Sequence, residues 1–566
     1  MSKIQELLRQ GRYEELWQMG CGFIDLNLEQ FMAIQERLLL EQIELLKGCE
    51  LGRKIMRSAM PETVEEFREE VPLTTYTDYC PELLEQREDV LPVKPVTWMH
   101  TSGRSVEYSA GQSTTVKWMP LSPMFYHELA TIMLGCGLFA SCKEKGDTSP
   151  LKKKRPKYLY AVAARPYTSG TFAYIGQNEI MGESLPPLDE AEELPFDARI
   201  QIGFRQALSQ GLDVFFGLST VLVAVGEKIS QQSRTVDIRS FLSDPRALFR
   251  LLRGLVRSKL ARRPMLPRDL WSVKAIMGGG ADSTVFRTEI KELWGRCPLE
   301  VYAGTEGSVY AAQTWDYEGM TFIPNLNFFE FIPEAERFKW QLDHDYQPKT
   351  VLLDEIKAGA CYEMVITNFH GGIMTRYRLG DVVRITSMRN EKLGIDIPQM
   401  VFESRADDII DITGFGRLTE KIVWQAIENT NIPYTDWTVR KEVIDGKPIL
   451  HLYLELKDNY IASERGVATA AYEQLVKLDD EYEYNIYRAY GTPEAVLGVK
   501  PVRVTLLSQG AFDNYVAQRQ AEGADLAHLK PPHINPSDRV LSLLGAKVKA
   551  VPEEEALVEP EVAVRR

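Results

Sequence analysis

The sequence has no long apolar run. Even uncharged stretches such as residues 129–142 and 214–226 are only 14 and 13 residues long. A helix that crosses a bilayer needs about 20 apolar residues, so we expect no transmembrane helix. The N-terminus carries charge from Lys3 onward and lacks the apolar core of a secretory signal. We therefore expect a cytoplasmic location.

Cysteine and histidine are both sparse and scattered. There are seven of each, the cysteines form no CxxC pair, and the histidines form no HxxxH or HExxH pattern. Closely spaced pairs of this kind are typical of zinc sites, so a zinc enzyme is not expected. The cysteines are expected to be reduced and buried as small apolar side chains.

Positive charge is in the minority. Lys and Arg number 66 against 80 Asp and Glu, a net charge of −14. An acidic chain argues against nucleic acid or an anionic membrane as a partner, and we expect neither. A locally basic pocket for a nucleotide remains compatible with this balance. The hydrophobic share of 44% and the charged share of 26% are ordinary for a globular protein and exclude a largely disordered or fibrous chain.

The order of predicted elements indicates an α/β fold. Residues 1–60 show helical spacing of apolar side chains. Residues 272–277 read as a strand, followed by three glycines, a helix that ends near Gly295, and a further strand at 299–302. A strand, a helix and a strand within about thirty residues form a βαβ unit, which implies parallel pairing.

The C-terminal part has a different pattern. Residues 437–444 and 449–456 flank an Asp-Gly turn and predict a hairpin, which a helix from about residue 463 and a strand at 502–507 follow. We therefore expect a large N-terminal α/β domain over residues 1–404 and a smaller α+β domain over 405–547. Residues 548–566, rich in Glu, Pro and Val, are expected to be a disordered tail.

Three common signatures of phosphate binding and catalysis are absent. The sequence contains no GxxxxGK[ST] phosphate loop, no GxGxxG dinucleotide fingerprint and no GxSxG nucleophile elbow. Any nucleotide would have to be bound by another arrangement of hydroxyls, glycines and charged side chains.

Four polar segments offer that chemistry. Residues 101–105 (TSGRS), extended by 111–117 (GQSTTVK), place hydroxyls, backbone N–H groups and cations where phosphate could bind. Residues 302–307 (YAGTEG) end a predicted parallel strand and include a glutamate that could hold Mg²⁺. Residues 377–381 (YRLGD) put an aspartate in a predicted turn, where it could accept hydrogen bonds from ribose hydroxyls, and residues 405–407 (RAD) follow at the domain boundary. Taken singly, each segment could equally be an ordinary turn or linker.

Together and in this order, the four segments resemble those of the acyl-adenylate-forming superfamily. Within it, the chain looks most like the auxin-responsive acyl-acid amido synthetases and their bacterial relatives. The narrower match lies in residues 67–79 (FREEVPLTTYTDY), 327–333 (NFFEFIP), 510–515 (GAFDNY) and 529–532 (LKPP). The resemblance covers roughly residues 60–535 and implies a large adenylate-forming α/β domain with a smaller, mobile α+β domain.

The resemblance also implies roles for individual residues. The phosphate loop matches Thr101, Ser102, Gly103, Ser105 and Lys117; the adenine site matches Gly279, Gly280 and the stacking Tyr302. The α-phosphate ligand matches Thr305, the metal ligand Glu306, the ribose ligands Asp381 and Arg405, the hinge acid Asp407, and the lysine that reaches the reacting carboxylate Lys530. The implied catalytic residues are Lys530 and Glu306, and the implied cofactors are ATP and Mg²⁺.

The sequence departs from the family pattern at two places. Arg104 replaces the third hydroxyl of the phosphate loop, and residues 106–110 separate Ser105 from the following glycine. Either Ser105 or residues 113–115 could therefore contact phosphate. Ser404 stands where the superfamily has a glycine at the hinge.

The implied activity is activation of a carboxylic acid by ATP, followed by transfer to an amine, with an amino acid as the expected acceptor. Three alternatives stay open: an acyl-CoA ligase with the same first step, a non-catalytic nucleotide-binding relative, and an interaction scaffold whose glycine turns are only structural. The sequence names neither the acid nor the amine and leaves the oligomeric state open, because pocket walls come from distant segments.

Overall fold

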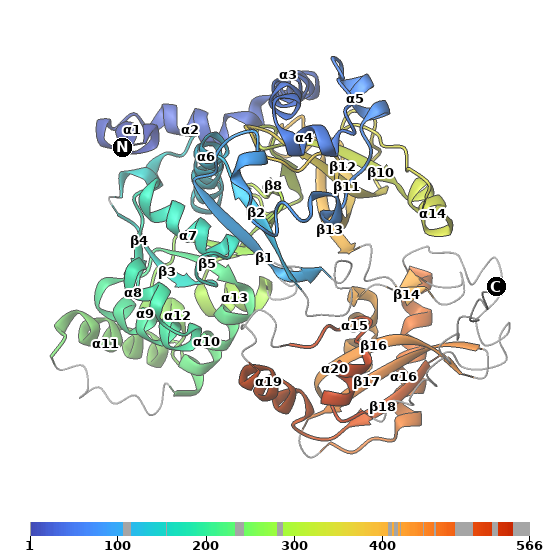
Figure 1. Cartoon of the computed structure of the whole chain (residues 1–566). Coiled ribbons are helices and arrows are strands. Elements are labelled where there is room, and N and C mark those ends of the chain that lie inside the picture. Colours follow the sequence, from blue (N-terminus) through green and yellow to red (C-terminus); the bar gives the residue numbers. More distant parts are fainter. Residues whose placement is uncertain are drawn as a thin grey trace, which may run out of the picture. The chain divides into compact units, whose positions relative to one another are not determined.

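The chain folds as two units, Met1–Ala406 and Asp407–Arg566, each with its own core (Figure 1). The computed structural model describes residues 2–105, 115–153, 155–232, 243–279, 287–343, 345–405, 410–411, 417–418, 420–444, 447–457, 460–481, 502–522 and 530–546. The expected fold class is confirmed, with a large α/β unit and a smaller α+β unit. The expected tail at 548–566 lies outside the described residues.

The N-terminal helices follow the predicted spacing. They are α1 (Lys3–Gln10), α2 (Tyr13–Cys21), α3 (Leu28–Gly48), α4 (Glu50–Ile55) and α5 (Val64–Glu70). Asn27 caps α3 in a reciprocal capping box with Gln30. The buried amide of Gln35 donates to the Pro324 and Asn327 carbonyls and accepts from the Phe329 N–H, which fixes α3 against the sheet.

An 11-stranded sheet runs through the large unit in the order β10-β11-β12-β13-β9-β8-β7-β6-β5-β3-β4. Its strands are β3 (Lys157–Ala161), β4 (Glu183–Leu185), β5 (Val214–Leu218), β6 (Ala275–Gly279), β7 (Leu299–Gly304), β8 (Ser308–Ala312), β9 (Met320–Phe322), β10 (Asn327–Pro333), β11 (Cys361–Asn368), β12 (Tyr377–Ser387) and β13 (Gln399–Arg405). From β7 to β4 the pairs are parallel, and from β7 to β10 they are antiparallel. The parallel half is the part in which α/β sheets place ligands.

Strands β1 (Thr97–Ser105) and β2 (Thr115–Leu121) pair antiparallel as a separate two-stranded ribbon. Helices cover the large sheet. The helices are α6 (Pro123–Ser141), α7 (Thr168–Asn178), α8 (Leu188–Glu193), α9 (Phe196–Gln210), α10 (Ser219–Gln232), α11 (Pro245–Leu260), α12 (Pro267–Leu270), α13 (Arg287–Trp294) and α14 (Glu334–Leu342). Figure 1 shows α9 to α12, in green, gathered beside β3 to β5. Of the described helices, none combines the length and apolar character that a bilayer crossing requires.

The predicted βαβ unit is confirmed as β6, α13 and β7, with β6 and β7 parallel. Gly295 ends α13 with a φ of +78°, a left-handed backbone that glycine adopts without strain. Residues 280–286, between β6 and α13, lie outside the described residues.

The small unit has the predicted order of hairpin, helix and strand. Strands β16 (Tyr434–Ile444) and β17 (Lys447–Leu456) pair antiparallel, and β18 (Val502–Leu507) pairs in parallel with β17. The remaining elements are β14 (Ile410–Asp411), β15 (Arg417–Leu418), α15 (Glu420–Asn429), α16 (Glu464–Glu481), α19 (Ala511–Ala521) and α20 (Asp538–Leu543). The alternating Leu450, Leu452 and Leu454 are buried with residues of α15 and α16 in one core.

A buried ion pair ties the C-terminal end of α5 to the sheet. The Arg376 Nε and Nη2 atoms lie 3.0 and 2.8 Å from the two Glu330 carboxylate oxygens. Arg376 Nη1 donates to the backbone carbonyls of Arg68 and Val71, each at 2.5 Å. The two ion-paired side chains are only 6% and 1% exposed, so neither charge can be solvated if its partner is lost.

We expect Glu330→Gln to lower the free energy of unfolding by about 3 to 5 kcal/mol, the usual effect of leaving one buried charge uncompensated. Guanidinium denaturation of the folded variant measures this. The matched control is Glu318→Gln, because Glu318 pairs with Lys392 on the exposed surface and its loss should cost at most about 1 kcal/mol. Equal stability of the two variants would contradict the prediction.

Candidate active site

The predicted α-phosphate ligand, Thr305, and the predicted metal ligand, Glu306, lie on one tight turn. Thr305, Glu306 and Gly307 connect β7 to β8, and β8 returns antiparallel to β7. Because β7 pairs in parallel with β6 on its other side, the turn stands at the carboxyl end of a parallel strand, as the sequence predicts.

Side chains from distant strands fix the backbone of this turn. The Asn368 amide donates to the Glu306 carbonyl at 3.0 Å, and the Asn327 amide donates to the Gly307 carbonyl at 2.8 Å. The Gly307 N–H donates to the Tyr310 hydroxyl at 3.1 Å. A Cβ on Gly307 would lie 2.4 Å from the Tyr310 ring, so only glycine fits there. The turn is therefore held in one conformation before any ligand binds.

Lys117 of β2 lies beside Glu306. Its ammonium is 3.8 Å from a Glu306 carboxylate oxygen and donates to the Tyr377 hydroxyl at 3.2 Å. The same ammonium is 5.6 Å from the centre of the Tyr76 ring. Burial, and secondarily the Glu306 carboxylate, raise the pKa of Tyr377 well above its usual range, so its phenol stays neutral. Lys117 and Glu306 thus form a partly buried pair of opposite charges at the turn.

Thr168, the first residue of α7, donates to the Thr305 hydroxyl at 2.7 Å. The sequence motifs that predict the site do not include Thr168, and they give Asn327 and Asn368 no role in supporting the turn. A signal for Thr168 was present, because residues 167–171 (YTSGT) have the same mixture of hydroxyls and glycine as residues 101–105. The asparagines carry no local signal, since their contacts join strands far apart in the sequence.

Tyr302 of β7 and Asp381 of β12 meet, although β8, β9 and β13 lie between their two strands in the sheet. The Tyr302 hydroxyl donates to Asp381 Oδ2 at 2.7 Å, and its ring centre lies 4.8 Å from that of Tyr310 and 5.9 Å from that of Phe402. In the pairing of β12 with β13, Asp381 is opposite Arg405. The two expected ribose ligands therefore occupy directly opposed backbone positions.

One expectation for this region is wrong. The sequence predicts that Asp381 lies in a turn, whereas β12 is continuous from Tyr377 to Ser387 and includes Asp381. Gly380 has a φ of +70°, and the pairing of β12 with β11 shifts register between Arg378 and Val382. The glycine marks an irregularity inside the strand, as a β-bulge does, and not a turn at its end.

The expected phosphate loop is partly strand. Thr101, Ser102, Gly103 and Ser105 end β1, where Arg104 and Ser105 are paired with Val116 and Thr115 of β2. Their contacts to a ligand are not defined, because the structure describes no side chain from 101 to 116, and residues 106–114 lie outside the described chain.

The other expected ligands are spread over both units. Gly279 ends β6 and Arg405 ends β13, whereas Gly280 and Asp407 lie outside the described residues. Lys530 belongs to the small unit and is exposed. The structure therefore brings together Lys117 with Glu306 and Tyr302 with Asp381, among the residues named from the sequence.

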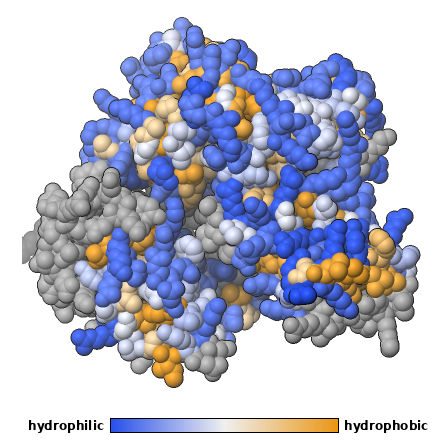
Figure 2. Space-filling view, turned by 180° about the vertical axis from the view of Figure 1, so that it is seen from behind, coloured by the Kyte–Doolittle hydropathy of each residue, from blue (hydrophilic) through white to orange (hydrophobic). Residues whose placement is uncertain are grey.

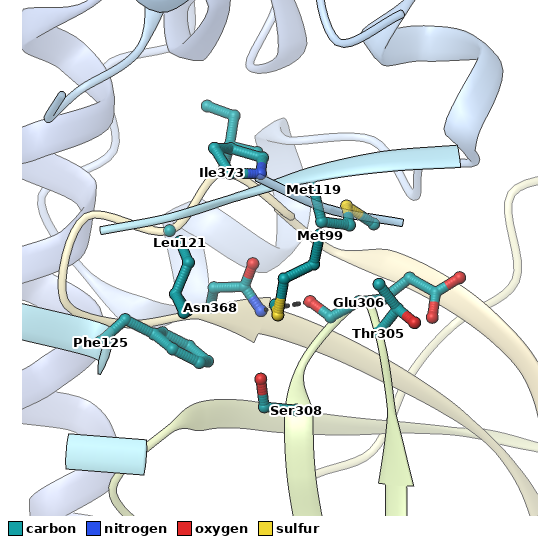
Figure 3. Close-up of a pocket in the computed structure, with 11 residues that line it drawn as sticks. Met99, Met119, Leu121, Phe125, Thr305, Glu306, Ser308, Asn368 and Ile373 are labelled. Atoms are coloured by element: carbon teal, nitrogen blue, oxygen red, sulfur yellow. Dashed lines mark hydrogen bonds between the residues drawn. The ribbon is translucent and has the colours of Figure 1, made fainter. Parts of the chain in front are cut away.

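A small pocket adjoins the turn (Figure 3). Its apolar lining comes from Met99, Met119, Leu121, Phe125 and Ile373, and its polar lining from Thr305, Glu306, Ser308 and Asn368. In Figure 3 the Glu306 carboxylate points away from Phe125. The turn thus presents a carboxylate at one side and an apolar cavity at the other.

Within the described part of the chain, no three His, Cys, Asp or Glu side chains gather as a protein-only metal site. A single carboxylate at the turn suits the other common arrangement, in which Mg²⁺ takes one or two protein oxygens and completes its shell with substrate phosphates and water.

Solved structures share this fold over nearly the whole chain. AtGH3.15 acyl acid amido synthetase in complex with 2,4-DB has a TM-score of 0.64 at 16% identity, covering 93% of this chain and 95% of that chain. A 2-hydroxyisobutyryl-CoA ligase in complex with 2-HIB-AMP has a TM-score of 0.54 at 16% identity, covering 91% of each chain. The chain has the fold of the adenylate-forming enzymes.

The narrower resemblance is also confirmed, because two stretches of the chain match domains of the GH3 family. The GH3 family N-terminal domain matches residues 21–181, and the GH3 family central domain matches residues 320–405. The β1–β2 ribbon lies within the first match, and Asn327, Asn368 and Asp381 lie within the second, whereas their partners on residues 302–307 lie in neither.

Curated relatives match part of the chain as well. A probable indole-3-acetic acid-amido synthetase GH3.11 from Oryza sativa subsp. japonica is 27% identical over 239 residues, 41% of this chain and 39% of that protein. The jasmonoyl--L-amino acid synthetase JAR4 from Nicotiana attenuata is 28% identical over 233 residues, 40% of this chain and 37% of that protein. These matches span less than half of the relatives' own length.

Proposed function

We propose that this protein is an ATP-dependent ligase that activates a carboxylic acid as an acyl adenylate and then joins it to the amine of an amino acid. The observation that carries the proposal is the Thr305–Glu306 turn, which combines fixed polar ligands with an adjacent apolar pocket. The name of JAR4, a jasmonoyl--L-amino acid synthetase, supplies the acceptor class, and the name of GH3.11, an acid-amido synthetase, supplies the kind of bond formed. We place the reaction in the cytoplasm.

The chemistry needs two transfers. In the first, a carboxylate oxygen bonds to the α-phosphorus of ATP while the bond from that phosphorus to the bridging oxygen breaks and pyrophosphate leaves. In the second, an amine bonds to the acyl carbon, loses a proton, and AMP leaves. Phosphoryl transfer depends mainly on positioning and on neutralising charge, which a site of hydroxyls, lysine and carboxylate can supply without a covalent nucleophile.

The described residues fit Mg·ATP. Glu306 would supply the protein's oxygen ligand to Mg²⁺, and Thr305, whose hydroxyl accepts from Thr168, would face the phosphates. Mg²⁺, when bound, offsets the charge on the phosphates. Lys117 would add a second cation at this turn, and Asp381 and Arg405 would bind the ribose.

The acid would enter the apolar pocket beside the turn. Its free volume is about 10 Å³, room for roughly one water molecule. An acyl group therefore needs some of the lining to move. Met99 and Met119 are suited to this because the unbranched methionine side chain repacks readily. Among the described residues of the lining, Glu306 is the only charged one and its carboxylate points away from Phe125, which favours an acid with an uncharged body.

ATP–pyrophosphate exchange across a panel of carboxylic acids tests the first step. Product analysis with amino acids or with coenzyme A as acceptor then separates an amido synthetase from an acyl-CoA ligase, the activity named for one structural neighbour. Acid-dependent exchange with amide formation is the expected result. ATP binding without exchange would instead assign a non-catalytic relative, and the absence of ATP binding would assign a scaffold.

Tyr302→Phe should raise the KM for ATP about three- to tenfold with a smaller change in kcat. The variant removes the hydroxyl that orients Asp381, and one hydrogen bond contributes about 1 kcal/mol. The control is Tyr158→Phe, which removes a buried hydroxyl that donates to the Ala173 carbonyl at 2.8 Å, outside this site. An unchanged KM in Tyr302→Phe would show that Asp381 needs no such orientation or binds no ribose.

A further inference from the structure

Helix α11 carries an apolar stripe on its exposed face. Phe249, Leu252, Val256 and Leu260 are 68%, 45%, 57% and 80% exposed and follow one another at intervals of three, four and four residues. Residues at this spacing lie on one face of a helix. Single exposed apolar side chains are common on proteins, but a row of four on one helix marks an interaction surface.

The opposite face of α11 packs against the rest of the large unit. Ala247, Leu251, Gly254 and Ser258 are buried, and a Cβ on Gly254 would lie 2.8 Å from the Leu270 side chain. Arg253 donates to the Leu270 carbonyl at 2.8 Å, and Arg250 donates to the Leu208 carbonyl. The helix is therefore firmly held by the protein while its stripe faces outward.

The charged side chains around the stripe are all positive. Residues 245–263 contain seven Lys and Arg and no Asp or Glu, although the whole chain has a net charge of −14. Arg246, Arg257, Lys259 and Arg262 are exposed. In Figure 2 the stripe is the orange band at the right, bordered by blue. The negative net charge of the whole chain argues against an anionic membrane as a partner, but the charge of this helix is positive.

A groove runs beside the start of the stripe. It has a volume of about 410 Å³ and is lined by Ser209, Gln210, Pro245, Arg246, Phe249, Arg250 and Arg253. Arg246 is exposed, whereas Arg250 and Arg253 also donate to backbone carbonyls. Their positive charge beside one aromatic ring suits an anionic head group whose apolar part continues along the stripe. A second copy of this chain does not fit the same face, because two helices of equal positive charge repel each other.

We propose that α11 docks the protein on the surface of a bilayer that contains anionic lipids, with the stripe among the acyl chains and the flanking cations at the head groups. A basic helix with an apolar face and a well-held opposite face lies in the plane of the interface and does not cross it. The association is reversible, depends on salt, and is independent of the function proposed above.

Vesicle flotation with the full chain tests the proposal. The protein should float with vesicles of phosphatidylcholine and phosphatidylserine and remain behind with vesicles of phosphatidylcholine alone. Phe249→Ser combined with Leu252→Ser should reduce binding at least tenfold. Arg257→Gln and Lys259→Gln should each reduce it about fivefold, the effect of one cation near an anionic surface. These residues are exposed, so circular dichroism and ATP–pyrophosphate exchange should be unchanged.

Two matched controls lie away from α11. Met60→Ser removes an exposed apolar side chain, 51% exposed, and Lys143→Gln removes an exposed cation, and neither should alter flotation. Absence of binding to anionic vesicles would overturn the proposal. Binding to polyglutamate without binding to vesicles, or self-association that the Phe249→Ser, Leu252→Ser variant abolishes, would also overturn it by assigning the face to an acidic protein or to a second copy.

Discussion

Glu306→Gln is expected to reduce acid-dependent pyrophosphate release by about 100-fold or more, the scale of losing one electrostatic stabiliser of a transition state. The substitution keeps the size and the hydrogen-bonding shape of the side chain and removes its charge. The carbonyl of residue 306 would still accept from Asn368, so the conformation of the turn should survive. The loss would therefore report on the carboxylate itself.

A control and a double variant make this result specific. Glu318→Gln removes a carboxylate from an exposed surface pair and should leave pyrophosphate release unchanged. If Glu306 acts only by holding Lys117, then Lys117→Met should cost as much, and the double variant should cost no more than either single one. If Glu306 also binds Mg²⁺, the Glu306→Gln variant alone should need more Mg²⁺ for half-maximal rate. Wild-type pyrophosphate release in Glu306→Gln would remove the residue from the proposed site.

Local sequence patterns predict those parts of the fold that are formed by residues close to one another in the sequence. The βαβ unit of β6, α13 and β7 follows from a strand, a glycine run, a helical spacing and Gly295. The hairpin of β16 and β17 follows from alternating leucines around an Asp-Gly pair. In each case, the apolar period and the turn residue lie within about thirty residues and agree with each other.

Features that depend on contacts between distant segments were not predictable in this way. Nothing near Asn327 or Asn368 indicates that their amides hold the turn of Glu306, since the hydrogen bonds span 20 and 62 residues. Gly380 was misread for a related reason. A glycine with positive φ is compatible with a turn or with a bulge, and only the neighbouring strands, β11 and β13, decide between them.

The segment that bears Lys530 is held tightly within the small unit. The Thr438 hydroxyl donates to the Pro532 carbonyl at 2.6 Å, and the Val439 N–H donates to the His533 carbonyl at 2.7 Å. The His533 ring lies between Glu420 and Asp436, with its two nitrogens 2.5 and 3.0 Å from their oxygens. Burial alone would lower the His533 pKa, but the two carboxylates outweigh it and raise the pKa to about 9. His533 is therefore a cation at neutral pH and anchors the residues that follow Lys530.

Lys530 itself is exposed in a segment whose backbone is anchored three residues later. That combination suits a side chain that acts on a ligand and not one that supports the fold. A lysine can orient a carboxylate and offset the charge that develops on the α-phosphate. The alternative is that Lys530 is a solvated residue before Pro531 and Pro532 with no role in catalysis. The two interpretations differ in which half-reaction suffers when the side chain is removed.

If Lys530 serves adenylation alone, Lys530→Ala should depress ATP–pyrophosphate exchange by about 100-fold or more, whereas chemically prepared acyl-AMP should still react with the amine at close to the wild-type rate. Lys441→Ala is the matched control, because Lys441 is an exposed lysine on β16 of the same unit, and both of its rates should be those of the wild type. Equal losses in both assays for Lys530→Ala would indicate a general defect of the small unit. Wild-type rates in both assays would show that Lys530 takes no part in the reaction. The adenylation chemistry would then need only residues of the large unit, and the small unit would have no role in the first half-reaction.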